Sequence, residues 1–176
     1  KFLDTYSKKK FLIFGFTSFI YEYLILKLKF DKKNMNFLNS TILHGGGWKI
    51  LENKKISDND FKSLIYDKLK INRIVNYYGT VEQTGSIFLE CKKCGNLKTS
   101  IYSDVIIRDN QFNSLGTNKT GIIQLFSTLP SSYPGHSILT EDMGKIVYDG
   151  NCKGNLGGKC FKIFGRIKKA QIRGCS

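Results

Sequence analysis

Acidic residues are scarce in this chain. It has 14 Asp and Glu against 28 Lys and Arg, so its 176 residues carry a formal net charge of +14. A basic surface attracts polyanions such as nucleic acids, nucleotides and anionic membranes. The lysines are scattered, with short runs at residues 8–10, 32–33 and 168–169, and a biased coding composition explains much of the charge equally well. We therefore keep a basic nucleic-acid-binding module as an alternative but expect no nucleic-acid partner.

Long apolar runs are also missing. The most apolar stretch, residues 11–26, is interrupted by Glu22 and is shorter than the roughly 20 residues that a membrane-spanning helix needs. No signal peptide is recognisable. We therefore expect a cytoplasmic protein without a membrane span. The sequence does not begin with Met, and we expect it to be the carboxyl-terminal part of a longer protein.

Proline is rare, and no Pro/Ser-rich hinge divides the chain, which has only two prolines. No internal repeat or low-complexity linker is present either. Hydrophobic residues make up 41% and charged residues 24%, as in an ordinary globular domain. We therefore expect one partial domain, residues 1–176, with an α/β portion at 1–84 and a β-rich portion at 85–176 that share one core.

The first portion alternates between the two kinds of hydrophobic periodicity. Apolar runs that predict strands lie at Phe11–Phe16, which we expect to be buried, at Thr41–Leu43 and at Arg73–Asn76. Helical spacing predicts helices at Phe19–Phe30, capped by Thr17 and Ser18, and at Asn59–Leu69, capped by Ser57 and Asp58. Strand, helix, strand, helix, strand predicts a parallel βαβαβ sheet.

The second portion loses the helical periodicity. Short β-rich runs separated by glycines and asparagines lie at 86–89, 103–107, 121–125, 137–140, 145–148, 161–164 and 171–172. This pattern predicts a mostly antiparallel sheet or a small barrel. The fold class is therefore α/β, with a parallel half followed by a β-rich half.

A nucleotide-site motif follows the third predicted strand, at residues 76–83. Gly79 allows the backbone to turn. The ring of Tyr78 can lie flat on a purine, and the carboxylate of Glu82 can hold a magnesium ion that bridges phosphates. An aromatic pair that only packs in the core is the alternative interpretation.

Three glycines follow the second predicted strand, in His44-Gly45-Gly46-Gly47-Trp48. The carboxyl edge of an open parallel sheet is where ligands bind, and glycines let the backbone approach a ligand closely. A tight turn with Trp48 anchored in the core is the alternative. His44 fits a packing or hydrogen-bonding histidine as well as a catalytic one.

Two further strand ends carry side chains that suit a ribose. We expect a strand to end in a turn at residues 138–144, where Asp142 can accept hydrogen bonds from both ribose hydroxyls. Arg166, after Phe164-Gly165, ends another strand and offers a guanidinium for a ribose or phosphate. A plain turn and a solvated arginine are the alternatives.

The five cysteines are an odd number in a sequence without a signal peptide, which favours a reducing compartment and thiol or metal chemistry. Cys91-x-x-Cys94-Gly resembles half of a zinc knuckle, and with Cys152 and Cys160 it predicts a four-thiolate structural zinc site. Ordinary partly buried thiols are the alternative. Cys175 stands apart, and the neighbouring Arg173 favours its nucleophilic thiolate form.

The order of these motifs resembles that of one family. HGGGWK, YGTVEQ, ILTEDMG and IFGRIKKAQIRGC follow one another as in the Lux-type acyl-protein synthetases, the long-chain-fatty-acid–protein ligases, which look like distant members of the adenylate-forming ligase superfamily. The resemblance spans nearly the whole chain. It implies part of the large domain of that fold, ATP and Mg2+ as cofactors, a fatty-acid substrate, and transfer of the acyl group from an acyl-adenylate to a cysteine thiol.

The resemblance also implies roles for individual residues. Tyr78 would stack on the purine and Glu82 would hold Mg2+. Cys175 would be the acyl acceptor, with an acyl-reductase or acyl-acceptor protein as partner. The remaining nucleotide-binding positions would be Gly45, Gly46, Gly47, Gly79, Thr80, Asp142 and Arg166.

Three departures from the superfamily pattern leave a degenerate, non-catalytic scaffold as an alternative. Val81 stands where the superfamily has Thr, Lys169 stands where it has a hinge Asp, and no Ser/Thr/Gly-rich phosphate loop lies upstream.

Overall fold

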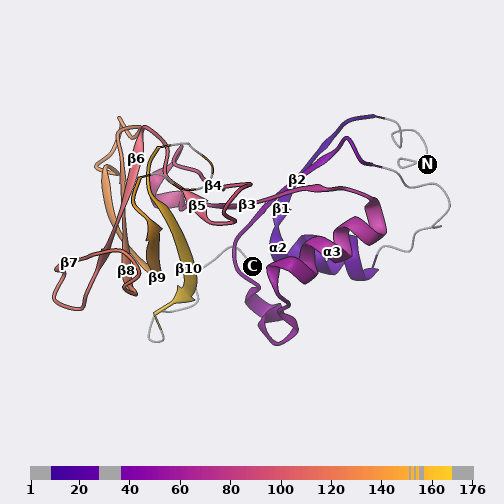
Figure 1. The fold of residues 1–176 in the computed structure, drawn as a ribbon, viewed down its shortest axis with the longest axis horizontal. Helices are drawn as coiled ribbons and strands as arrows, with labels where there is room; N and C mark the ends of the chain where they lie inside the picture. Colours follow the sequence, from indigo (N-terminus) through magenta and orange to yellow (C-terminus); the bar gives the residue numbers. More distant parts are fainter. Residues whose placement is uncertain (1–8, 28–36, 151, 153, 155–156, 168–176) are drawn as a thin grey trace. The chain divides into compact units, whose positions relative to one another are not determined.

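The computed structural model describes residues 9–27, 37–150, 152, 154 and 157–167 (Figure 1). The chain folds into two compact units, residues 1–77 and 78–176, and each is described by itself. The division into portions 1–84 and 85–176 of a single domain stays a prediction. None of the helices in the described part of the chain has the length and hydrophobicity of a membrane-spanning segment.

The first unit contains the predicted parallel sheet. Its strands, in spatial order, are β1 (Leu12–Phe16), β2 (Thr41–Gly45) and β3 (Arg73–Tyr78), and both pairings are parallel. Strand β1 is followed by α2 (Thr17–Phe19) and the π-helix η1 (Ile20–Lys27), and β2 by the 3-10 segment η2 (Lys49–Lys54) and α3 (Asp58–Leu69). The predicted βαβαβ order is confirmed.

Local sequence signals explain where α3 begins and which face it buries. The Ser57 side chain accepts a 3.1 Å hydrogen bond from the backbone N–H of Asp60, which satisfies one of the free N–H groups at the helix start. Phe61, Ile65 and Leu69 repeat at spacings of four and are buried against the sheet. The predicted cap and helix are confirmed.

Strand β1 corrects the prediction of a buried strand. Leu12, Phe14 and Phe16 are 61%, 63% and 39% exposed. Side chains alternate between the two faces of a strand, and only the face that carries Ile13 packs into the core cluster with residues of η1 and α3. The other face of β1, which lies at the edge of the three strands, stays exposed to a large extent, and its Phe14 stacks on Tyr77 of β3.

The second unit is an antiparallel sheet, as predicted. Its strands are β4 (Phe88–Glu90), β5 (Leu97–Lys98), β6 (Ser103–Arg108), β7 (Ser114–Leu115), β8 (Gly121–Ser127), β9 (Ser137–Tyr148) and β10 (Cys160–Arg166). Their order is β4-β5-β10-β9-β8-β6-β7 (Figure 1), and a 3-10 turn, η3 (Val81–Gln83), precedes them. The core contains Phe88, Val105, Ile123 and Phe161. The strand predicted at 171–172 lies outside the described residues.

Strand β9 corrects a second prediction. The sequence predicted two strands with a turn around Asp142, but residues 137–148 form one continuous strand. The glycine that suggested a turn, Gly144, lies within the sheet, where an added Cβ would be 2.3 Å from the carbonyl oxygen of Lys162 and 2.7 Å from Ile123 Cδ1. Gly144 therefore permits a close approach of neighbouring strands and does not mark a reversal of the chain.

Replacing Gly45 by Ala should destabilise the fold. A Cβ at Gly45 would lie 2.6 Å from the carbonyl oxygen of Tyr77 and 2.7 Å from its Cε1, whereas a Cβ at Gly47 would meet no heavy atom within 4 Å. We expect Gly45→Ala to cost about 1–3 kcal/mol of unfolding free energy, measured by urea denaturation. Gly47→Ala is the control, and equal stabilities of the two variants would contradict the assignment.

Candidate functional site

The carboxyl end of β2 is held by a small polar network. His44 is 2% exposed, and its Nδ1 lies 3.0 Å from the hydroxyl oxygen of Thr17, which itself donates a 3.1 Å hydrogen bond to the carbonyl of Gly45. Because the hydroxyl hydrogen goes to Gly45, the Thr17 oxygen accepts from Nδ1–H. Nε2 of His44 has no hydrogen-bond partner in the described part of the chain.

This network settles the two interpretations of His44 in favour of packing. Its ring lies against Phe61, with centroids 4.8 Å apart, and burial lowers its pKa to about 4. The network also corrects the predicted helix cap, because Phe16 occupies the N-cap position without a side-chain bond. The Thr17 hydroxyl bonds to β2 instead.

The three glycines have three different surroundings. Gly45 lies against Tyr77, whose ring stacks on Phe14 with centroids 5.4 Å apart. Gly46 has a left-handed φ of 74°, which a residue with a Cβ rarely adopts. Gly47 is exposed, with open space around it. Trp48 is buried and packs edge-to-face on Tyr21 at 4.9 Å, so the predicted tryptophan anchor is present beside the open glycine.

In the second unit, Tyr78 and Asp142 are joined directly. The Tyr78 hydroxyl donates a 2.7 Å hydrogen bond to Oδ2 of Asp142. The tyrosine ring packs on Phe88 and Phe161, with centroids 6.1 and 6.4 Å away. Burial, then the charge of Asp142 and the hydrogen bond to it, raise the pKa of Tyr78 far above its usual value, so this hydroxyl remains a donor at neutral pH.

Arg166 lies on β10, the strand next to β9, directly opposite Asp142. In the register of β9 and β10, Arg166 is paired with Asp142. Its guanidinium is 3.9 Å from Oε2 of Glu141, and these side chains are 43% and 47% exposed. The second unit therefore brings together three of the predicted nucleotide-binding residues, Tyr78, Asp142 and Arg166, and leaves the arginine open to solvent.

The turn after β3 carries the predicted magnesium residue. Thr80 is the N-cap of η3, Val81 is 88% exposed, and Glu82 is exposed beside it. The hydroxyl oxygen of Thr80 is buried and has no hydrogen-bond partner among the described residues. Sequence reasoning missed Gln83, which is 1% exposed and anchors the turn by donating a 2.8 Å bond to the carbonyl of Gly135. No sequence signal distinguishes such a buried glutamine from a surface one.

Four cysteines meet in the second unit. The Sγ atoms of Cys91 and Cys152 are 3.8 Å apart, and those of Cys94 and Cys160 are 3.9 Å apart. Burial raises the pKa of Cys160 to about 12. A backbone hydrogen bond from Gly154 lowers the pKa of Cys152 to about 7. The predicted acyl acceptor, Cys175, lies outside the described residues.

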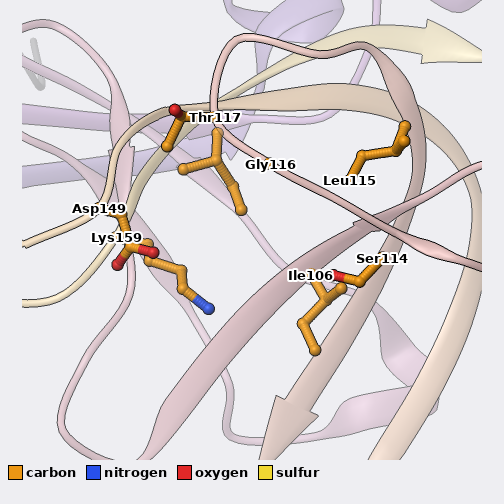
Figure 2. A pocket seen from close by; sticks show the side chains of 8 residues that line it. Ile106, Ser114, Leu115, Gly116, Thr117, Asp149 and Lys159 are labelled. Carbon is orange, nitrogen blue, oxygen red and sulfur yellow. The ribbon is translucent and has the colours of Figure 1, made fainter.

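Two hollows in the second unit are lined by other residues. One, of about 310 Å³, is lined by Arg108, Phe112, Gln124 and Leu139. The other, of about 240 Å³, is lined by the side chains around Lys159 that Figure 2 shows. The ammonium of Lys159 already donates to Asp104 Oδ2 at 2.8 Å and to the carbonyl of Val105 at 3.0 Å. Neither hollow includes a predicted nucleotide-binding residue.

Comparison with known proteins gives one family. The family described as "Acyl-protein synthetase, LuxE" matches residues 3–176. The long-chain-fatty-acid–luciferin-component ligase of Aliivibrio fischeri is 24% identical over an alignment of 176 positions that covers 97% of this chain and 45% of that protein. The chain therefore spans about half the length of this curated relative.

Solved structures share the fold. The luciferase-like enzyme of the nonluminescent mealworm Zophobas morio has a TM-score of 0.61 at 17% identity, over 96% of this chain and 40% of that one. ATP-bound MatB from Rhodopseudomonas palustris has a TM-score of 0.62 at 15% identity, over 94% and 32%. The anthranilate CoA ligase AuaEII in complex with anthranoyl-AMP gives 0.63 at 10% identity, over 93% and 30%. The predicted ligase fold is confirmed.

The buried His44 should make stability depend on pH. Its folded pKa of about 4 is below the ordinary value of 6.5, so the unfolded chain binds a proton that the folded chain does not, and stability falls as pH drops from 6.5 towards 4. The loss should reach about 2 kcal/mol at pH 5, measured by urea denaturation across this range. His44→Gln should remove that component.

The chain's other histidine, the exposed His136, supplies the matched control. His136→Gln should keep the pH dependence of the original protein. If His44→Gln keeps it as well, the dependence comes from other groups and the assignment to His44 is wrong.

Proposed function

Because the chain belongs to the acyl-protein synthetase family, LuxE, we propose that it supplies the nucleotide-binding portion of an enzyme that activates a long-chain fatty acid with ATP and transfers the acyl group to a protein thiol. The observation that carries this proposal is the meeting of Tyr78, Asp142 and Arg166 at one level of the second unit. A family match over nearly the whole chain supports the same chemistry.

The Tyr78–Asp142 pair suits the nucleoside part of ATP. Asp142 uses Oδ2 for the tyrosine hydroxyl, so Oδ1 remains to accept hydrogen bonds from ribose hydroxyls. The hydrogen bond and the packing on Phe88 and Phe161 fix the plane of the tyrosine ring, and a fixed ring is a good stacking surface for a purine. Arg166, opposite Asp142, would donate to the ribose or a phosphate.

The glycines of the first unit suit a ligand that approaches the backbone. Gly45 and Gly46 are required by the fold, through the contact with Tyr77 and the left-handed φ. Neither a close contact nor a left-handed φ requires a glycine at position 47, and the space around Gly47 is open. We assign Gly47 as the glycine of this segment that is open to a ligand.

The turn at η3 suits the phosphates. Glu82 is exposed on this turn and would contribute a carboxylate oxygen to the Mg2+ that accompanies ATP. Gly79 and Thr80 precede it on the same turn. When bound, Mg2+ would neutralise phosphate charge.

The proposed reaction has two steps. A carboxylate oxygen of the fatty acid attacks the α-phosphorus of ATP, and pyrophosphate leaves with the bonding electron pair. The thiolate of Cys175 then attacks the acyl carbonyl, and AMP leaves as the thioester forms. An acyl-reductase or another acyl-acceptor protein would take the acyl group from Cys175. The comparisons support neither the nucleic-acid-binding module nor the degenerate scaffold.

Pyrophosphate exchange into ATP, driven by long-chain fatty acids, tests the proposal. It should be measured with the full gene product that contains this chain. Asp142→Ala should lower the exchange rate about 10–100-fold, because it removes a charge-assisted contact to the ribose and the partner of Tyr78. Asp67→Ala, on the exposed face of α3, is the control and should leave the rate unchanged. If no carboxylic acid stimulates the exchange, the proposed ligase activity is wrong.

Cys175→Ser should separate the two steps. Adenylation needs no thiol, so exchange should persist in this variant, whereas stable acylation of the protein by radiolabelled fatty acid should be lost. A thioester is cleaved by neutral hydroxylamine, so the label on the original protein should be released by that treatment. Recovery of a hydroxylamine-labile acyl-protein from Cys175→Ser would disprove the role of Cys175.

A further inference from the structure

We propose that Cys91, Cys94, Cys152 and Cys160 bind one structural Zn2+ ion that fastens the β4–β5 hairpin to Cys152, which follows β9, and to Cys160, which begins β10. This proposal is independent of the ligase activity. Cys91 and Cys94 belong to the hairpin. Their contact partners are distant in the sequence: Cys152 follows Cys91 by 61 residues, and Cys160 follows Cys94 by 66 residues.

Three of the sulfur atoms lie close enough together for one tetrahedral ion, and the fourth, that of Cys160, is in contact with one of these three. A Zn–S bond of about 2.3 Å in a tetrahedron places the sulfurs about 3.8 Å apart. The two measured pairs are 3.8 and 3.9 Å apart, and the sulfurs of Cys91, Cys94 and Cys152 all lie within 4.8 Å of one another. All four are free cysteines, and a disulfide would need sulfurs only about 2 Å apart.

The hairpin has the backbone of a zinc knuckle. Gly95 donates a 2.8 Å hydrogen bond from its backbone N–H to the carbonyl of Cys91 and has a left-handed φ of 65°. Cys91 in turn donates from its backbone N–H to the carbonyl of Asn96 at 2.8 Å. The Asn96 side chain donates to the carbonyl of Cys94 at 3.0 Å. These bonds hold the two cysteines of the turn in fixed positions, as a knuckle requires.

Donors around the sulfurs suit thiolates. Cys152 Sγ accepts a 3.4 Å hydrogen bond from the backbone N–H of Gly154. It also lies 3.8 Å from the ammonium nitrogen of Lys98. Four thiolates around Zn2+ carry a net charge of −2, so donors and a cation nearby stabilise the site. An added Cβ at Gly154 would lie 2.9 Å from Cys91 Sγ, so the glycine keeps space free beside the sulfurs.

The arrangement favours a structural zinc ion over other occupants. Cys91, Cys152 and Cys160 are at most 7% exposed, and a closed set of four thiolates leaves no coordination position for a substrate. An iron–sulfur cluster distributes its cysteines over several iron atoms, whereas the sulfur pairs here are only 3.8 and 3.9 Å apart, which suits ligands of one ion. Thiolates that surround a single position in a tetrahedron select zinc or a single iron ion.

Metal analysis and cobalt substitution of the full gene product test the site. The protein should be purified under reducing conditions without a polyhistidine tag, and it should contain about one zinc ion per chain. After replacement of zinc by Co2+, the protein should show the intense visible bands of tetrahedral cobalt and a thiolate-to-cobalt charge-transfer band. A strong chelator should lower the melting temperature of the zinc-loaded protein.

Variants assign the ligands. Cys91→Ser and Cys160→Ser should lower zinc affinity at least about tenfold, and Gly154→Val should also weaken binding because its side chain intrudes on Cys91 Sγ. Cys175→Ser is the matched control and should retain the full zinc content. If the cluster variants fail to fold, the cobalt spectrum of the original protein decides alone.

Three results would overturn the proposal. The first is that the protein contains no metal after growth with added zinc. The second is that it contains iron in place of zinc. The third is that the four cluster thiols react with a thiol reagent as fast in the presence of zinc as in its absence.

Discussion

The hydrogen bond between Tyr78 and Asp142 is the interaction on which the arrangement of the candidate site depends. It joins the end of β3 to the middle of β9 over 2.7 Å. Strand β9 is paired on both sides, with β8 and with β10, so the carboxylate is held by the sheet. Tyr78 packs on Phe88 and Phe161, and its bond to Asp142 is partly buried, where a hydrogen bond is stronger than in water. Arg166 needs no separate anchor, because strand pairing already places it opposite Asp142.

Much of the fold was predictable because its signals are local. Alternating periodicities gave the parallel order of the first unit, and Ser57 marked the start of α3. The error at Gly144 shows where local reasoning ends. A glycine in a turn and a glycine beneath a neighbouring strand look the same in sequence, and only the carbonyl of Lys162 on the adjacent strand distinguishes them. The exposed face of β1 has the same cause, since the sequence does not tell which elements cover a strand.

The candidate site was predictable as a set of residue types but not as an arrangement. Asp142 and Arg166 were singled out for their chemistry, while their pairing depends on a register with an irregularity between Ile163 and Gly165. The contact of Cys91 with Cys152 depends in the same way on the pairing of β5 with β10. Thr17 could be assigned only a cap, because its true partners lie on a strand that comes later in the chain.

The two adjacent tyrosines at the end of β3 divide their work between opposite faces of a strand. Tyr77 stacks on Phe14 above Gly45, and Tyr78 bonds to Asp142. Since the side-chain period of a strand is two residues, inserting or deleting one residue within β3 would send each ring to the face that the other requires. Insertions and deletions in related proteins should therefore lie before residue 73 or after the turn at η3. A gap inside β3 in a sequence alignment would indicate that the sequences are aligned incorrectly there.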